Sequence, residues 1–285
     1  MNIKKLYVFI LAVLLPILGF AQAQINTKKV KIGDFTHKTT KVILTGNMFY
    51  DSMLEDAVIA NWKISPYEFC SLSEFDELKS NDEYYFLLIT KGQFKKESEP
   101  GLQFLTLVKG GSDSEKGIGA MLEIASLPFA SAEDPSGRES TYFPAFINVI
   151  QAHARKSMDR DIHAYSGLSN ISSSLSSIQG MTIVFSEDDF SSQITDEVKA
   201  AFIDENMTIT SESDADNYMS DTASNVVVSY VVAPTDAKAG SYCYKMLFDN
   251  QSHTLYYYKK KKISKDSGVG FLIEDLHKIS AYRTK

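Results

Sequence analysis

The sequence predicts an α+β protein made of two tandem repeats joined by a long helix. Three observations support this fold class. The chain matches itself at a shift of 140 positions, each copy mixes β-branched runs with segments of helical spacing, and a longer helical pattern separates the copies. In each copy we expect a strand, a helix, a strand, a short helix, a strand, a hairpin and a closing helix.

The first 23 residues have the three parts of a cleavable secretory signal. Lys4 and Lys5 precede an apolar run over residues 6–20, and residues 21–23 (Ala-Gln-Ala) offer small side chains to a signal peptidase. A spanning helix needs about 20 apolar residues, more than this run contains. No cysteine follows the small residues, so a lipoprotein is not expected. We expect export to the periplasm or the extracellular space, with a mature chain that starts near Gln24.

Composition restricts the class of protein. Without the signal, 27 Lys and Arg stand against 36 Asp and Glu, a net charge of −9, which argues against a general nucleic-acid binder. The hydrophobic content of 44% is typical of a globular protein. No later segment is long and apolar enough to predict a membrane span.

The internal match is ordered along the chain. At a shift of 140, residues 42–44 fall on 182–184, Leu54, Val58 and Trp62 fall on Ile194, Val198 and Phe202, and residues 71–76 fall on 211–216. The shift then grows. Residues 85–88 fall on 227–230 at a shift of 142, and residues 117–123 fall on 268–274 at a shift of 151. This growth in the shift predicts about one extra strand in the second copy.

The first half of each copy is assigned from periodicity and capping residues. Residues 41–46 and 180–185 are expected first strands. The i, i+4, i+8 spacing that starts at Leu54 and at Ile194 predicts one apolar helix face in each copy. The candidate caps are Asp51 for the first of these helices, Ser191 or Ser192 for its counterpart, Ser71 with Glu74 or Ser73 with Asp76 for the short helix, and Ser213 with Asp216 for its copy.

The second half of each copy is rich in strands. Residues 67–70 and 207–210 are expected second strands, while 83–90 and 225–232 are apolar on both faces and therefore central. Residues 101–110 predict a further strand in the first copy. The second copy predicts a hairpin of 241–249 and 254–262 around the turn DNQSH, and each copy is expected to close with a helix after its glycine pair, Gly117 and Gly119 or Gly268 and Gly270.

A helical pattern with Pro144 in its first turn lies between the copies, and a Ser-rich segment interpreted as a linker follows it. The predicted organisation is a signal peptide (1–23), an N-terminal segment (24–40), a first α+β repeat (41–135), a connecting helix with the Ser-rich linker (136–179) and a second α+β repeat (180–285).

This order of elements, with the VVVSYVV strand (226–232), a charged loop and the LFDNQSHTLYYYK hairpin (247–259), resembles the small α+β domain of some periplasmic accessory proteins. These are the amino-terminal domain of the Tol–Pal periplasmic protein and the lipoproteins of curli secretion and of penicillin-binding-protein activation. The resemblance covers about 80 residues of each copy and implies binding to partners without catalytic residues. The whole chain also resembles two-repeat secreted bacterial proteins of unknown function.

Cys70 and Cys243 occupy non-equivalent positions of the two copies, the first before a short helix and the second within a hairpin strand. We expect two free thiols that are at least partly buried. Because export permits a disulfide, a single bridge between them is the alternative.

Motifs for catalysis, a metal or a cofactor are not found. His153 and His163 lie about 15 Å apart along one helix, too far to share an ion, and both are expected on the helix surface. The segment KGGSDSEKGIG (109–119) lacks the Gly-Lys-Ser/Thr order of a phosphate loop. We expect no cofactor and no metal, although a Ser–His–Asp site assembled from distant positions stays open.

The second copy is polarised in charge. Residues 186–221 hold 11 acidic side chains and one Lys, and the acidic groups at Asp214, Asp216 and 187–189 are expected to form solvated surfaces. Residues 245–265 hold six Lys and one Asp, and there Tyr256, Tyr257 and Tyr258 run directly into Lys259, Lys260, Lys261 and Lys262.

This basic aromatic strand is the candidate site, with Tyr256, Tyr258, Lys259, Lys260, Lys261 and Lys262 as residues that bind an anionic partner. The alternative is that the lysines protect an exposed edge strand from aggregation.

The sequence favours a secreted non-enzymatic interaction protein or an accessory protein of the cell envelope. Two alternatives stay open: a carbohydrate- or anion-binding module that uses the basic aromatic hairpin, and a hydrolase with its site between the repeats. A concave, enclosed polar pocket between the copies favours the enzyme, whereas a flat charged face favours the interaction partner.

Overall fold

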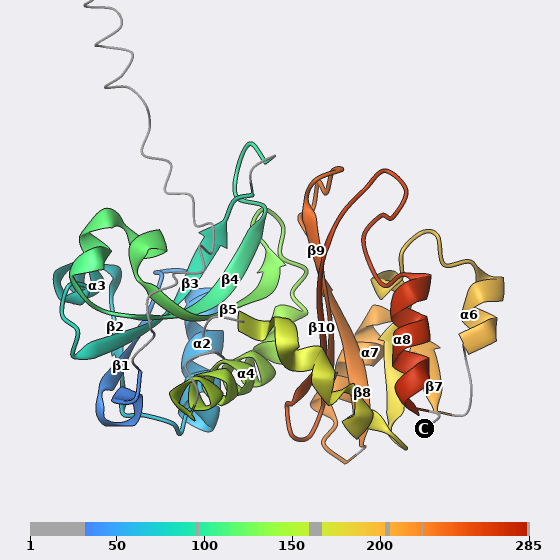
Figure 1. The fold of residues 1–285 in the computed structure, drawn as a ribbon, viewed down its shortest axis with the longest axis horizontal. Helices are drawn as coiled ribbons and strands as arrows, with labels where there is room; N and C mark the ends of the chain where they lie inside the picture. Colours follow the sequence, from blue (N-terminus) through green and yellow to red (C-terminus); the bar gives the residue numbers. More distant parts are fainter. Residues whose placement is uncertain (1–31, 95–96, 160–166, 203–205, 224, 284–285) are drawn as a thin grey trace, which may run out of the picture.

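A computed structural model describes residues 32–94, 97–159, 167–202, 206–223 and 225–283 (Figure 1). The predicted signal peptide and residues 24–31 lie outside these ranges, as does His163. Two five-stranded mixed sheets lie side by side along the long axis of the molecule (Figure 1). Within the described ranges, none of the helices combines the length and apolar character needed to cross a membrane.

The first sheet has the strand order β2-β1-β3-β4-β5. Strand β1 pairs in parallel with β2 and β3, and β4 and β5 continue the sheet as an antiparallel hairpin. In chain order the elements are η1 (Phe35–His37), β1 (Thr39–Ile43), α2 (Met48–Asn61), β2 (Tyr67–Cys70), α3 (Leu72–Leu78), β3 (Tyr84–Gly92), β4 (Leu102–Lys109), η2 (Ser112–Lys116), η3 (Ile118–Ala120), β5 (Leu122–Ser131) and α4 (Glu139–Asp159).

The second sheet repeats this topology, with the order β7-β6-β8-β9-β10 read from its parallel edge. Strand β6 is parallel to β7 and β8, and β9 and β10 form the antiparallel hairpin. Its elements follow η4 (Gly167–Ile178): β6 (Thr182–Ser186), η5 (Glu187–Asp189), α6 (Asp196–Phe202), β7 (Met207–Thr210), α7 (Glu212–Ser220), β8 (Val226–Val232), β9 (Tyr242–Asp249), β10 (Leu255–Lys262) and α8 (Ile273–Arg283). The predicted tandem α+β repeats are confirmed.

The glycine match at a shift of 151 does not relate equivalent elements. Gly117 lies between β4 and β5, whereas Gly268 lies between β10 and α8. Residues 122–131, expected to belong to a closing helix, form β5, and the closing helix of the first unit is α4. The expectation of an extra strand in the second copy is therefore wrong, because both sheets have five strands.

The short helices begin where the 140-residue shift places them. Ser71 caps α3 in a capping box with Glu74, and Ser211 caps α7 by accepting from the backbone N–H of Asp214. The expected pairs Ser73 with Asp76 and Ser213 with Asp216 do not cap these helices.

The longer helices start at other residues than expected. Asn47, not Asp51, caps α2, because the Asp51 carboxylate accepts from the backbone N–H groups of Thr45 and Gly46 in the preceding turn. Helix α6 begins at Asp196, so neither Ser191 nor Ser192 caps it.

The 140-residue shift aligns β1 with β6 one residue away from their structural match. Ile43 packs with Cys70 and Phe75 on the face of its sheet that α3 covers. Ile183, its expected counterpart, packs on the opposite face with the residues around α6 and α8. Side chains alternate along a strand, so a displacement of one residue exchanges the two faces.

Helix α4 belongs to the core instead of only connecting the repeats. Its Phe146 lies within 5.6 to 6.1 Å, between ring centroids, of Phe129 from the first sheet and of Tyr230 and Phe248 from the second. The Tyr230 hydroxyl also donates to the backbone carbonyl of Phe129 at 2.6 Å. One apolar core therefore extends through α4 from one sheet to the other.

The Ser-rich segment is a packed element and not a free linker. It forms the 3₁₀ helix η4 and buries Leu168, Leu175 and Ile178. The Ser172 hydroxyl donates to the carbonyl of Tyr258 at 2.9 Å and accepts from the N–H of the same residue at 3.2 Å. This segment therefore covers part of the outer edge of β10.

Both cysteines are free and buried, as expected. Burial raises the pKa of the Cys243 thiol to about 11 and also raises that of Cys70. A high pKa and exclusion from solvent both suppress the reactive thiolate.

We predict that iodoacetamide at pH 8 labels neither thiol rapidly in the folded protein, and labels both after unfolding without a reductant. Mass spectrometry of the intact chain measures both states. The absence of two labels in the unfolded, unreduced sample would instead demonstrate a disulfide.

Candidate ligand-binding site between the repeats

The basic aromatic strand does not form one continuous charged patch. Strand β10 is the edge strand of the second sheet, and its side chains alternate between the two faces. Lys259 and Lys261 lie on the face covered by α8, where they contact its acidic residues, while Lys260 lies on the opposite face, against aromatic rings. Alternation places Lys262 on the same face as Lys260, and its side chain is exposed.

The two lysines toward α8 are neutralised within the protein. The Nζ atom of Lys259 lies 2.7 Å from a Glu274 carboxylate oxygen and 2.8 Å from one of Asp275, and that of Lys261 lies 3.1 Å from Glu274. Asp275 is fully buried and also binds the buried Lys245 and accepts from the Tyr257 hydroxyl at 2.6 Å. These contacts fasten α8 to the hairpin and leave little charge for a partner.

The tyrosines of the strand are packed against the protein. Tyr256 is half-buried beside the β-bulge of β10, and the Tyr258 ring lies 5.9 Å from that of Tyr244. Of the six expected binding residues, Lys260 alone lines a cleft that the structure describes. Tyr258 does not line this cleft, but its ring contacts that of Tyr244, which does.

Lys260 points its ammonium group into an aromatic cage made by both repeats. The Nζ atom lies 4.3 Å from the ring centroid of Tyr242, 4.5 Å from that of Phe94 and 5.6 Å from that of Tyr244. Phe94 follows β3 of the first sheet, whereas both tyrosines belong to β9 of the second. Rings within about 6 Å stabilise a cation through their π faces.

This cage forms one side of a cleft with a volume of about 280 Å³. The floor is the face of the first sheet made by β3, β4 and β5, and the opposite wall is made by β9 and β10. Phe104 adds a further aromatic side chain, and η3 closes one end with Ile118 and Gly119. The cleft therefore exists only because the two repeats are packed together.

A row of hydroxyl groups crosses the floor of the cleft. Thr106 lies 2.9 Å from Thr90 and 2.9 Å from Ser126, hydroxyl to hydroxyl, on three adjacent strands. A hydroxyl has one donor and two acceptor positions, so the row keeps hydrogen-bonding capacity toward the cleft.

A carboxyl group stands beside this row. Burial raises the pKa of Glu123, and burial lowers the pKa of Lys260, which is the charge across the cleft from it. Glu123 is half-buried, whereas Lys260 as a whole residue is exposed, so the desolvation is greater for the carboxyl group than for the ammonium.

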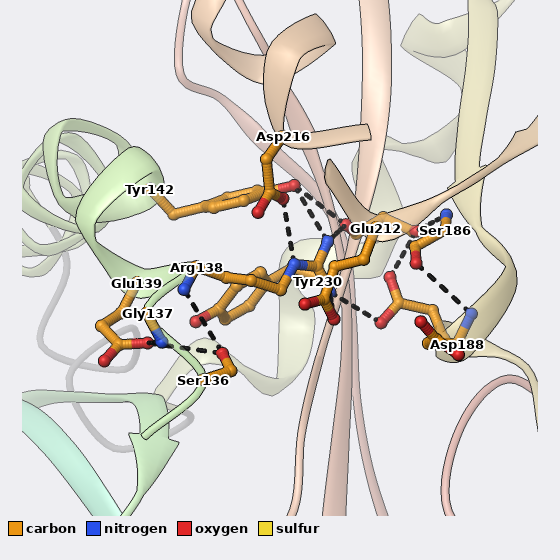
Figure 2. Close-up of polar contacts among 12 residues, drawn as sticks. Ser136, Gly137, Arg138, Glu139, Tyr142, Ser186, Asp188, Glu212, Asp216 and Tyr230 are labelled. Atoms are coloured by element: carbon orange, nitrogen blue, oxygen red, sulfur yellow. Dashed lines mark hydrogen bonds and ion pairs between the residues drawn. The ribbon is translucent and has the colours of Figure 1, made fainter. Parts of the chain in front are cut away.

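Arg138, which immediately precedes α4, links the two repeats through ion pairs (Figure 2). Its guanidinium lies 3.0 Å from Asp189, 2.9 Å from Asp216 and 3.6 Å from Glu212, all on the second repeat. It also lies 5.1 Å from the ring centroid of Tyr230. The side chain is 5% exposed, so these carboxylates balance a charge that water does not reach.

The carboxylates around Arg138 have further partners. Asp189 accepts from the Ser229 hydroxyl at 2.5 Å, and Ser229 in turn accepts from the backbone N–H of Ser186 at 3.0 Å. Burial raises the pKa of the Asp189 and Asp216 carboxyls, and the guanidinium opposes this rise. The expectation of solvated acidic surfaces is therefore wrong for these two residues.

Sequence reasoning missed Arg138 and the cleft floor, because isolated Arg, Thr and Glu residues carry no local pattern. The signal that could have indicated the Arg138 cluster is the excess of acid in residues 186–221, because any of these carboxylates that is buried needs a cation from elsewhere in the chain.

Comparison with known proteins gives no relative. No family model matches the sequence. No curated protein matches it, and no solved structure matches the fold.

Proposed function

We propose that this chain is an exported, non-enzymatic binding protein, and that the cleft between its repeats holds a small hydroxylated ligand that carries a carboxylate. Export is inferred from residues 1–23, as described for the sequence. The ligand class is inferred from the side chains that line the cleft. An acidic monosaccharide has the required combination of groups.

The observation that carries the proposal is that the Lys260 ammonium group has no carboxylate partner among the described residues. Its neighbours Lys259 and Lys261 are paired with carboxylates of α8. Among the described residues, by contrast, no carboxylate oxygen lies within 4 Å of the Lys260 ammonium, which faces the cleft from a cage of rings. Lys260 is exposed and lines a concave site, and a cation there without a carboxylate partner attracts an anionic group.

The remaining lining supports a hydroxylated ligand. Thr90, Thr106 and Ser126 can exchange hydrogen bonds with hydroxyl groups, and Glu123 can do the same from the end of the row. The volume of about 280 Å³ suits a molecule of monosaccharide size. Binding is favoured over sugar hydrolysis because Glu123 is the one carboxyl group in the described lining, whereas glycoside hydrolysis usually uses a pair.

The proposal is tested by titration calorimetry with glucuronate, galacturonate and lactate, and with glucose as the uncharged control. We expect at least one carboxylate to bind about tenfold more tightly than glucose, because a charge-assisted hydrogen bond contributes about 1.5 to 3 kcal/mol. Lys260→Met should abolish this preference. The matched control is Lys262→Met, two residues along the same face of β10, which should retain it.

Two results would overturn the proposal: no carboxylate binds at millimolar concentration, or Lys260→Met binds as tightly as the unchanged protein. Far-ultraviolet circular dichroism of each variant shows whether the fold is kept.

A further inference from the structure

A second hollow, separate from the cleft around Lys260, lies at another junction of the two repeats. It has a volume of about 720 Å³ and is lined by the end of α2, by α4, by η4 and by the turn between β9 and β10. Its charged lining consists of Lys63, Arg155 and Lys156, whose side chains are exposed. Within the described chain, its lining includes no Asp or Glu. The groove is therefore locally positive, although the protein as a whole has a net charge of −7.

A series of hydrogen bonds through side-chain amides crosses this groove, and the donor in each bond is determined by the bond before it. The backbone N–H of Lys63 can only donate, so Gln151 accepts it through Oε1 at 3.1 Å. The Gln151 amide nitrogen then donates to the carbonyl of Asn61 at 2.9 Å and to Oδ1 of Asn148 at 2.6 Å. The Asn148 amide nitrogen is left to donate to Nδ1 of His253 at 3.0 Å.

This chain of donors determines the state of His253. Because Nδ1 accepts, the proton of the neutral imidazole is on Nε2. Burial lowers the pKa of His253, which agrees with a neutral ring at neutral pH. The ring therefore carries one N–H donor, at Nε2, and His253 is one of the residues that line the groove.

The backbone at His253 is also held in an uncommon conformation. Its φ of 56° makes it the only non-glycine residue with positive φ in the described ranges. Histidine is among the residues that tolerate this region, and such conformations persist where surrounding contacts hold them, often at binding sites. The bond to Asn148 is one such contact, and it positions the imidazole on the wall of the groove.

We propose that this groove binds a ligand with two or more phosphate groups. Arg155, Lys156 and Lys63 supply the charge, and the Nε2–H of His253 supplies a directed hydrogen bond. Three separated cations around a hollow of this size match several anionic groups better than one. Guanidinium, ammonium and N–H groups together are donors suited to phosphate oxygens. A soluble oligophosphate and a phosphorylated lipid headgroup share this chemistry.

The test uses sodium tripolyphosphate with the full mature chain, followed by calorimetry at 50 and 200 mM salt. We expect binding that weakens as salt rises, and that is at least tenfold tighter than binding of inorganic monophosphate. Arg155→Gln with Lys156→Gln should weaken it at least tenfold, and His253→Asn, which tolerates the same backbone conformation, should weaken it several-fold. Lys265→Gln, an exposed lysine on the loop before α8, is the matched control and should bind normally.

A second arm identifies the source of the phosphate. Co-sedimentation with phosphatidylcholine vesicles, with and without cardiolipin, whose headgroup carries two phosphates, detects a headgroup ligand that the double Gln variant no longer binds. Binding of tripolyphosphate alone indicates a soluble ligand. The proposal is wrong if neither probe binds, or if the double Gln variant binds both as well as the unchanged chain. Lys260→Met should leave this binding intact, which separates the groove from the inter-repeat cleft.

Discussion

Replacing Arg138 with methionine is expected to lower the free energy of unfolding by about 3 to 5 kcal/mol, because it leaves buried carboxylates without their counter-charge. Asp189 is 4% exposed, so water cannot replace the guanidinium there, and Asp216, at 18% exposed, is only partly reached by water. Asp189 keeps the hydroxyl of Ser229, which is neutral and cannot balance its charge. Urea unfolding followed by circular dichroism measures the change.

The matched control for Arg138 is Arg155→Met, at an exposed arginine within α4. We expect it to change stability by less than about 0.5 kcal/mol. A double variant, Arg138→Met with Asp189→Asn, should be less destabilised than the sum of its single variants, because it removes both charges of one pair. A loss below about 1 kcal/mol for Arg138→Met would show that the cluster is not important for the union of the repeats.

Replacing Trp62 with alanine is expected to cost about 3 to 5 kcal/mol, the range for a large aromatic side chain removed from a core. Trp62 ends α2, is 4% exposed and packs edge-on against Phe35 with ring centroids 6.3 Å apart. Its indole N–H donates to the Ser65 hydroxyl at 3.1 Å, so the substitution also removes a satisfied donor. Urea unfolding gives the free energy.

Phe202 is the internal comparison for Trp62, because the repeat places it at the end of the corresponding helix. It is only half-buried and contacts the His277 ring at 4.9 Å between centroids. The two positions are therefore related by the repeat but not equally buried, and Phe202→Ala should cost clearly less than Trp62→Ala. Equal losses would contradict this difference in burial.

Local patterns in the sequence predicted much of the fold. The period of apolar residues indicated the alternation of strands and helices, and Ser71 with Glu74 indicated the start of α3. The turn between residues 249 and 255 indicated the β9–β10 hairpin. Each of these predictions depends on residues a few positions apart. The internal repeat then presents the same pattern a second time in the second copy.

The local signal failed where glycines were matched by their spacing alone. The match of Gly117 and Gly119 with Gly268 and Gly270 predicts a closing helix after Gly119, whereas the segment that follows forms β5. Its place in the sheet depends on pairing with β4, which no short pattern in the segment itself specifies.

The sequence by itself determined that two α+β units follow one another in this chain, because periodicity and capping act over one helix turn or one strand. The tertiary structure alone decided that Lys259 and Lys261 are neutralised by α8 while Lys260 faces a cleft. It alone brought Arg138 to Asp189, 51 positions away in the chain. The physical reason is that the energy of a charge depends on the groups and the water around it, and these are set by packing between distant segments.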